Sequence, residues 1–238
     1  MLKYYNIVVI SLITMGFCSL ASSKTVTSPF GNLDLSIAIT MASDYIWRGQ
    51  SQSNGPALQG SLFVVHESGL YTSIWTSNID DDVYLGASTE VDYYLGYNYK
   101  ITDDISTNLS LSKFSWLQAS ELNVYNAVSS ISGYGFTLGY KYDFNRKNGA
   151  HPSYSWVSYN YELPYHIMLS TNYGHTDNKN NGKDYNDWSI GLEKRLFGLD
   201  LNLTYSDTNI SSLTCKTIYT RGKACDSNLM FAITKVFK

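Results

Sequence analysis

The chain has 238 residues, a formal net charge of −3 at pH 7 and only 16% charged residues. This acidic balance argues against a nucleic-acid binder, which needs a basic surface to meet phosphate. Only 4 prolines and a 15% share of aromatic residues, including 21 tyrosines, exclude a disordered chain, and the length suits one large all-β domain.

The first residues have the layout of a secretory signal peptide. Lys3 supplies a positive charge, an apolar stretch follows over residues 7–17, and small residues follow over residues 19–23. The apolar stretch is too short to span a bilayer as a helix, which needs about 20 residues. We therefore predict a signal peptide over residues 1–23 and a β-barrel over residues 24–238. A retained anchor is the alternative.

The rest of the chain shows period-2 alternation of apolar and polar residues. In one example, Val91, Tyr93 and Leu95 alternate with Glu90 and Asp92. Successive side chains of a strand point to opposite faces, so such a segment has one apolar and one polar face. We expect twelve strands, with ten or fourteen as alternatives. The expected strands cover residues 33–47, 57–65, 69–78, 89–100, 105–115, 120–131, 135–145, 153–162, 165–175, 185–196, 199–207 and 228–237.

The connections between these strands alternate between long and short, with one short exception at residues 116–119. Long outer loops and tight periplasmic turns are typical of outer-membrane barrels. The sequence therefore predicts an all-β fold, a closed antiparallel transmembrane β-barrel of about 12 strands with both termini periplasmic, in the outer membrane of a Gram-negative bacterium. A soluble β-sandwich or lipocalin-like barrel is the alternative, but its outside would be charged, whereas here charges collect in the connections.

In a transmembrane barrel the polar face lines the lumen. The candidate pore-lining charges are Asp44, Arg48, Glu90, Asp92, Lys141, Asp143, Glu162, Asp187, Glu193 and Arg195. Acidic members predominate, which favours a narrow water-filled pore with a mild preference for cations. The alternative is that these charges pair across the lumen and merely fill it. We expect Arg48 to reach a carboxylate such as Glu90 or Asp92, or else simply to begin the first outer loop.

Two cysteines remain after removal of the signal peptide, Cys215 and Cys225. Exported chains meet oxidising conditions, so we expect a disulfide that closes the last outer loop. A metal site there would have too few ligands, and the run of aspartates at residues 80–82 fits a solvated loop better than a cation site. No metal and no organic cofactor is implied.

Several motifs in the first part of the chain resemble those of the TorF porin family. They are SDYIWRGQSQ at residues 43–52, GPALQG at 55–60, ESGLY at 67–71, WTSNI at 75–79 and EVDYYLGY at 90–97. The resemblance covers residues 43–97 closely and the remainder more loosely. It implies an outer-membrane β-barrel that passes small solutes, and it supplies no catalytic residues.

The expected function is passive diffusion of small hydrophilic solutes through an outer-membrane porin-like channel. The expected partners are these solutes, outer-membrane lipids and the barrel-assembly machinery, with no nucleic acid, and the oligomeric state is open. A non-conducting structural or adhesin barrel is one alternative. An outer-membrane esterase is another, although among the histidines only His175 has a suggestive position and the chain has no G-x-S-x-G motif. We do not expect an enzyme.

Overall fold

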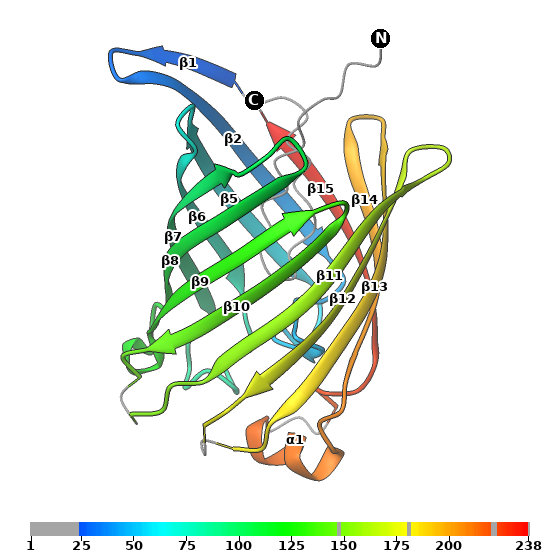
Figure 1. The fold of residues 1–238 in the computed structure, drawn as a ribbon. Coiled ribbons are helices and arrows are strands. Elements are labelled where there is room, and N and C mark those ends of the chain that lie inside the picture. Colours follow the sequence, from blue (N-terminus) through cyan, green and yellow to red (C-terminus); the bar gives the residue numbers. More distant parts are fainter. Residues whose placement is uncertain (1–23, 147–148, 180–181, 220–222, 238) are drawn as a thin grey trace.

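The computed structural model describes residues 24–146, 149–179, 182–219 and 223–237, so the predicted signal peptide lies outside the described residues. Twelve long strands form a closed antiparallel barrel (Figure 1). These strands are β2 (Gly31–Ala42), β5 (Ala57–His66), β6 (Leu70–Asn78), β7 (Thr89–Lys100), β8 (Ile105–Trp116), β9 (Val124–Gly133), β10 (Phe136–Phe144), β11 (Ser153–Leu163), β12 (Ile167–Asp177), β13 (Tyr185–Leu196), β14 (Leu199–Thr208) and β15 (Asn228–Phe237). The ring closes because β2 pairs with β5 on one side and with β15 on the other. The predicted all-β fold, a closed antiparallel barrel of twelve strands, is confirmed.

The remaining elements are short, and the sequence analysis missed them. Strand β1 (Lys24–Ser28) folds back on the start of β2, while β3 (Ile46–Trp47) pairs with β4 (Gln50–Ser51) inside the first loop. A 3₁₀ helix, η1 (Ser120–Leu122), and a helix, α1 (Ser212–Ile218), lie in later loops. None of them spans enough residues to give a periodic signal in the sequence.

Two predicted strand boundaries differ from the observed ones by more than two residues, and both errors concern loops. The strand expected over residues 33–47 ends at Ala42 because the chain turns into the barrel there, and the strand expected from residue 120 starts at Val124, after the 3₁₀ helix. The connection predicted to be short at 116–119 therefore runs over residues 117–123.

Long loops gather at one end of the barrel and tight turns at the other. The end that carries α1 (Figure 1) also has the loops at residues 43–56, 79–88, 117–123, 145–152, 178–184 and 209–227. The opposite end has the turns at residues 67–69, 101–104, 134–135, 164–166 and 197–198. We call these the loop end and the turn end. The predicted alternation of long and short connections is thus present.

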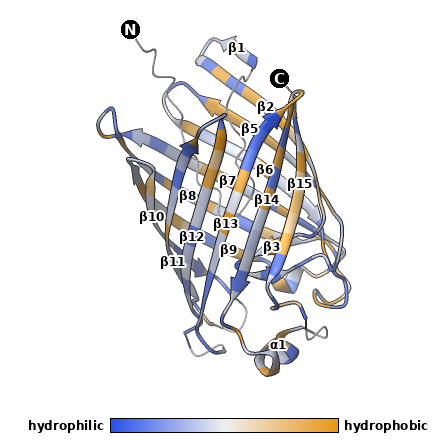
Figure 2. Cartoon of the chain, turned by 90° about the vertical axis from the view of Figure 1, so that its right-hand side faces the viewer, coloured by the Kyte–Doolittle hydropathy of each residue, from blue (hydrophilic) through white to orange (hydrophobic). Residues whose placement is uncertain are grey.

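The apolar face of the sheet looks outward. Leu95 and Leu111 expose 55% and 56% of their surface, and the strands in Figure 2 carry alternating bands of apolar and polar colour. The exposed apolar positions on the wall include Ile37, Ile39, Met41, Leu58, Leu62, Ile74, Leu109, Leu138, Ile190, Leu192 and Leu203. A soluble barrel would bury these side chains, so the soluble alternative is wrong.

Exposed aromatic residues form two belts on this outer surface. The turn-end belt comprises Tyr97, Tyr99, Tyr134, Phe136, Tyr161, Tyr165, Phe197 and Phe237, and the loop-end belt comprises Tyr93, Tyr125, Tyr142, Tyr173, Trp188, Tyr205 and Phe231. Between them the wall is mostly aliphatic, with Tyr140 on β10 as an exception. Aromatic rings with polar tips suit the two membrane–water interfaces, so the outside of the barrel fits a bilayer. None of the described helices is long and apolar enough to span a membrane.

Candidate functional site

A small hairpin within the first loop forms the centre of the site. Trp47 pairs with Gln50 and Ile46 with Ser51, which leaves Arg48 and Gly49 as a two-residue turn. Both turn residues have positive φ, 50° and 72°. A type I′ turn needs this geometry at both central positions, and glycine adopts it without steric cost. The local sequence therefore builds a tight hairpin with an arginine at its tip.

Polar contacts hold the base of the hairpin in one position. The hydroxyls of Ser51 and Ser53 each lie 2.9 Å from Oδ1 of Asp44, and the amide of Asn228 donates to Asp44 Oδ2 at 3.3 Å. Asp44, a candidate for the pore lining, thus lies in the loop and ties it to the start of β15. The carboxylate of Asp44 therefore stabilises the conformation of the first loop.

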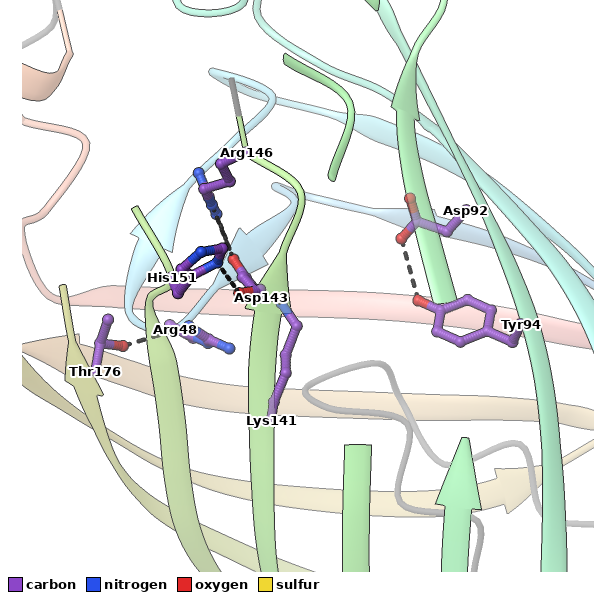
Figure 3. Close-up of polar contacts among 8 residues, drawn as sticks. All are labelled: Arg48, Asp92, Tyr94, Lys141, Asp143, Arg146, His151 and Thr176. Atoms are coloured by element: carbon purple, nitrogen blue, oxygen red, sulfur yellow. Dashed lines mark hydrogen bonds and ion pairs between the residues drawn. The ribbon is translucent and has the colours of Figure 1, made fainter. Parts of the chain in front are cut away.

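The tip of the hairpin reaches across the bore to the opposite wall. The guanidinium carbon of Arg48 lies 3.7 Å from the ring centroid of Tyr154 on β11 and 4.2 Å from that of Trp47. Nη1 of Arg48 donates to the hydroxyl of Thr176 on β12 at 3.4 Å (Figure 3). Such cation–π contacts stabilise more when they are desolvated, and Arg48 is only 5% exposed. The hairpin is therefore fixed at its far end.

The glycine of the turn permits this close approach. A Cβ atom at Gly49 would lie 2.5 Å from the backbone oxygen of Asp207 on β14. Arg48 forms no ion pair with Glu90 or Asp92 in the part of the chain that the structure describes, contrary to one of our expectations. The alternative, that Arg48 belongs to the first loop, is the one observed.

Two glutamines join the hairpin to its surroundings. The amide of Gln50 donates to the hydroxyl of Tyr185 on β13 at 2.9 Å and accepts from the hydroxyl of Tyr219 at 3.0 Å. Gln52 accepts a hydrogen bond from the hydroxyl of Tyr84 in the second long loop. Burial raises the pKa of Tyr84 well above its usual value, so this hydroxyl stays protonated and donates. The sequence analysis did not single out these glutamines, although both lie in the SDYIWRGQSQ motif.

The last loop packs on the same hairpin. Cys215 in α1 forms a disulfide with Cys225, as predicted, and the backbone N–H of Ser51 donates to the carbonyl of Ala224 at 2.8 Å. The first, second and last long loops thus meet over the bore. Their apolar side chains form two clusters, which contain Tyr45, Ile79 and Ala87 in one and Tyr219, Cys215 and Cys225 in the other.

Two basic residues, Lys141 on β10 and Arg146 in the loop after it, lie near the hairpin. The ammonium of Lys141 is 3.2 Å from a carboxylate oxygen of Asp143, which also forms an ion pair with Arg146 (Figure 3). The ammonium also lies 4.5 Å from the ring centroid of Phe114 and 5.3 Å from that of Trp47. The positive charge of Lys141 is thus held in the bore, next to the loop.

An acidic pair lies on β7, three strands away from β10. Glu90 and Asp92 are 4% and 1% exposed, and the hydroxyl of Tyr94 donates to Asp92 at 3.1 Å. Tyr45 is the hydrogen-bond partner of Glu90. Neither carboxylate has an ion-pair partner among the described residues. Figure 3 shows the Asp92–Tyr94 contact apart from the Arg48, Lys141 and Asp143 group.

The other candidate residues divide between the two ends. Asp187 on β13 is buried near the hairpin tip and accepts from the hydroxyl of Tyr154 at 3.1 Å. Near the turn end, Arg195 pairs with Asp200 at 2.6 Å, while Glu162 contacts the exposed His166. Glu193 lies on the same face as Arg195. Of the ten candidates, Arg48, Lys141, Asp143 and Asp187 come together at the loop end, and Glu90 and Asp92 lie at the same end but apart from them on β7.

The described residues contain no group of three or more His, Cys, Asp or Glu side chains placed to hold a metal ion. Within the aspartate run at residues 80–82, the backbone N–H of Asp82 donates to the carboxylate of Asp80, which is an ordinary loop contact. His175 pairs with Asn186 on the outer face of the wall. These contacts give no reason to place a catalytic or metal centre here.

One family model matches residues 24–237 and is described as a bacterial protein of unknown function, Gcw_chp. The chain belongs to the Gcw_chp family. This description does not confirm the resemblance to the TorF porin family, which stays a prediction. None of the curated proteins matches the chain significantly.

Solved structures with a similar fold are outer-membrane porins. The KdgM porin has a TM-score of 0.57 at 10% sequence identity, with 85% of this chain and 99% of that chain covered. KdgM in complex with disordered oligogalacturonate has a TM-score of 0.55 at 9% identity, covering 85% of this chain and 98% of that chain. At such low identity the likeness shows the fold alone. This Gcw_chp member has the barrel fold of outer-membrane porins, and these two neighbours are porins rather than enzymes.

Proposed function

We propose that this protein is a porin-like channel for passive diffusion of small hydrophilic solutes across the outer membrane of a Gram-negative bacterium. The observation that carries the proposal is the orientation of the two faces of the closed sheet. Leucine, isoleucine and tyrosine side chains are exposed outside, whereas the inward positions are mostly polar. A lipid-facing exterior around a polar interior is the design of a solute channel. The porin fold of the KdgM structures supports the same function.

The proposed topology places the turn end in the periplasm and the loop end outside the cell. Long outer loops with short periplasmic turns support this orientation, which puts both termini in the periplasm. It agrees with a signal peptide over residues 1–23 and with insertion by the barrel-assembly machinery, both of which are part of the proposal. Outer-membrane lipid is then the partner of the outer surface.

The proposed entrance is narrow and mildly cation-preferring. The hairpin of residues 46–51 crosses the bore, and the charged groups around it are four carboxylates and three cations. Lys141 and Arg146 both form ion pairs with Asp143, whereas Glu90 and Asp92 accept hydrogen bonds from tyrosine hydroxyls and have no ion-pair partner among the described residues. Carboxylates without a paired cation give a permeating cation the more favourable field.

Planar-bilayer recording of the purified, refolded protein tests the proposal. Discrete conductance steps are expected, with a reversal potential under a KCl gradient that indicates mild cation selectivity. The Glu90→Gln, Asp92→Asn double variant should move the reversal potential toward zero or toward anion selectivity. Glu162→Gln, an exposed carboxylate near the turn end, is the matched control and should leave it unchanged.

The outcomes separate the alternatives. A folded barrel that inserts and never conducts would instead be a structural or adhesin barrel. Clear anion selectivity of the wild-type channel would contradict the charge argument while leaving the channel itself intact. Hydrolysis of a lipid ester by the pure protein would contradict the proposal that it is not an enzyme.

A further inference from the structure

Aromatic rings lie flat on the inner wall over glycine residues. A Cβ atom at Gly139 would lie 2.0 Å from the ring of Trp156 on the neighbouring strand, so the indole covers the glycine backbone. Gly174 is covered in the same way by the ring of Tyr154, at 2.0 Å from its hydroxyl. Both rings project from inward positions of β11. Each ring therefore has one face on the wall and the other toward the bore.

The inward face of the Tyr154 ring is in contact with a cation. Arg48, which enters the bore with the hairpin, has its guanidinium carbon 3.7 Å from the ring centroid of Tyr154. The ring planes of Tyr154 and Trp156 differ by 20° and their centroids are 5.6 Å apart. The two rings thus make one continuous surface. The hairpin covers its outer part, and Trp156 continues the surface toward the turn end.

A second aromatic surface lies deeper in the barrel. The ring of Tyr71 on β6 covers Gly96, whose Cβ would be 2.4 Å from it, and Phe63 on β5 lies beside Tyr71 at 5.4 Å with ring planes 23° apart. The hydroxyl of Tyr71 accepts from the amide of Asn108 at 3.0 Å. Aromatic faces therefore occur at two depths of the bore.

Uncharged amides and hydroxyls fill the positions between these surfaces. Asn126 is completely buried on the inner face of β9, and neither its amide nitrogen nor its carbonyl oxygen has a hydrogen-bond partner among the described residues. The same is true of Nδ2 of Asn98, Oδ1 of Asn160 and the hydroxyl of Ser112. Buried polar atoms are normally satisfied by protein, water or ligand. These groups are both donors and acceptors and carry no charge.

Most of the charged residues lie above and below this region, although Asp143 is the strand partner of Asn126. Arg48, Lys141 and Asp187 belong to the loop end, and Glu193, Arg195 and Asp200 belong to the turn end. The row of strand partners that contains Gly139 and Trp156 reaches a charge only at Asp187, two strands beyond Trp156. The next row toward the turn end has no charge from β9 to β14 and consists of Ser132, Thr137, Ser158, Asn172, Ser189 and Ser206. A polyionic solute would meet no counter-charge there.

We infer that this uncharged band binds neutral polyhydroxylated solutes of the oligosaccharide class, in contact with Trp156 and the inward amides; the inference rests on the proposed channel function. A sugar ring has an apolar C–H face, which packs on an aromatic surface, and hydroxyls at its edge, which pair with amides and hydroxyls. The solute would pass the hairpin, lie against Trp156, and then meet the surface formed by Tyr71 and Phe63. KdgM binds oligogalacturonate, an acidic oligosaccharide. In this chain the carboxylates at the loop end favour the neutral form over the polyanion.

Two independent readouts test the inference with maltotriose as the neutral probe and trigalacturonate as the anionic probe of equal length. The first is block of single-channel current. The second is the tryptophan fluorescence of the folded protein in detergent, which needs no conduction. Maltotriose should give saturable changes in both, and trigalacturonate should need at least several-fold higher concentration.

Substitutions on the inner and outer faces of the wall test whether maltotriose binds at the inner wall. Trp156→Leu should weaken the apparent maltotriose affinity at least five-fold by current block, and Asn126→Leu should weaken it less. Trp188→Leu, which removes an indole from the outer surface of β13, is the matched control and should bind as the wild type does. If Trp156→Leu does not fold, as judged by β-sheet circular dichroism, Asn126→Leu and Tyr71→Leu carry the test.

Different experimental outcomes would contradict the sugar-binding inference and the proposed channel function. A conducting protein with no response to maltotriose in either readout, or with equal or tighter binding of trigalacturonate, overturns the inference alone. A protein that never conducts overturns the channel function, and the fluorescence titration then still decides whether the sugar site exists. Loss of binding in Trp188→Leu equal to that in Trp156→Leu would also overturn the inference.

Discussion

The loop-end and turn-end halves of the barrel interior use polar residues in different ways. At the loop end, ionised side chains and tyrosine hydroxyls hold a hairpin across the bore, with Arg48, Gln50 and Gln52 as its main contacts. Toward the turn end, amides and hydroxyls line most of the wall, with Glu193, Arg195 and Asp200 as a separate charged group, and the connections are turns of a few residues that cannot reach inward. The comparison teaches that loop length, rather than barrel width, determines where this lumen is narrowed.

The largest effect is expected from shortening the hairpin, which should remove the narrowing of the lumen at the loop end. Replacing residues 46–51 by a short Gly-Ser linker should raise the single-channel conductance roughly two- to five-fold, because a segment that crosses the bore is removed. Asn54→Gly is the control, because Asn54 is an exposed residue of the same loop with a φ of 55° and glycine keeps that backbone conformation. Its conductance should remain near that of the wild type. Unchanged conductance in the shortened variant would show that the hairpin does not limit flow.

The flat rings on the inner wall predict an effect of intermediate size on stability. Gly139→Val forces a side chain into the ring of Trp156 and should lower the free energy of unfolding by about 1–3 kcal/mol, as overpacking does. At Gly60, on the outer face, a Cβ would lie 3.7 Å from its nearest neighbour, an ordinary contact. Gly60→Val should therefore be neutral. Urea titrations of both variants in lipid vesicles measure the difference, and equal costs would argue against the flat-ring geometry.

The smallest effect on the barrel is expected from the disulfide. Chain-entropy arguments give a loop of this length about 2–3 kcal/mol, and that energy acts on the last loop only. In the Cys215→Ser, Cys225→Ser variant, proteolysis within residues 209–227 should be at least roughly tenfold faster, while the urea midpoint of the barrel stays the same. A shift of that midpoint would mean that the loop and the wall unfold together.

The wall was predictable from the sequence because each strand carries its own period-2 signal. Twelve strands, the outward apolar face and the disulfide all followed from local patterns or from counting cysteines. The hairpin was not predictable, because the turn at Arg48 and Gly49 shows only that the chain reverses. Its direction depends on Tyr154 and Thr176, more than one hundred residues away. The ring over Gly139 likewise depends on the register between β10 and β11.

The candidate charges were predicted because they lie on the inward face of their strands. Their grouping in space was not predicted. Nothing in the sequence separates Glu90 and Lys141, which lie at the loop end, from Glu193 and Arg195, which lie at the other. Depth in a barrel depends on where each strand begins relative to its neighbours, and strand boundaries are the least reliable part of a pattern-based prediction. Asp44 shows the cost of such an error, because an expected strand of 33–47 concealed a loop residue.

The distant contacts of the hairpin also impose an order on biogenesis. Arg48 and Gln50 are made early, but Thr176, Tyr185 and Tyr219 follow 128, 135 and 169 residues later. Until the C-terminal half of the sheet is in place, the first loop has nothing to dock against. A partly assembled ring is therefore wider open than the finished protein, and the passage acquires its final calibre only when the last strands have joined the first.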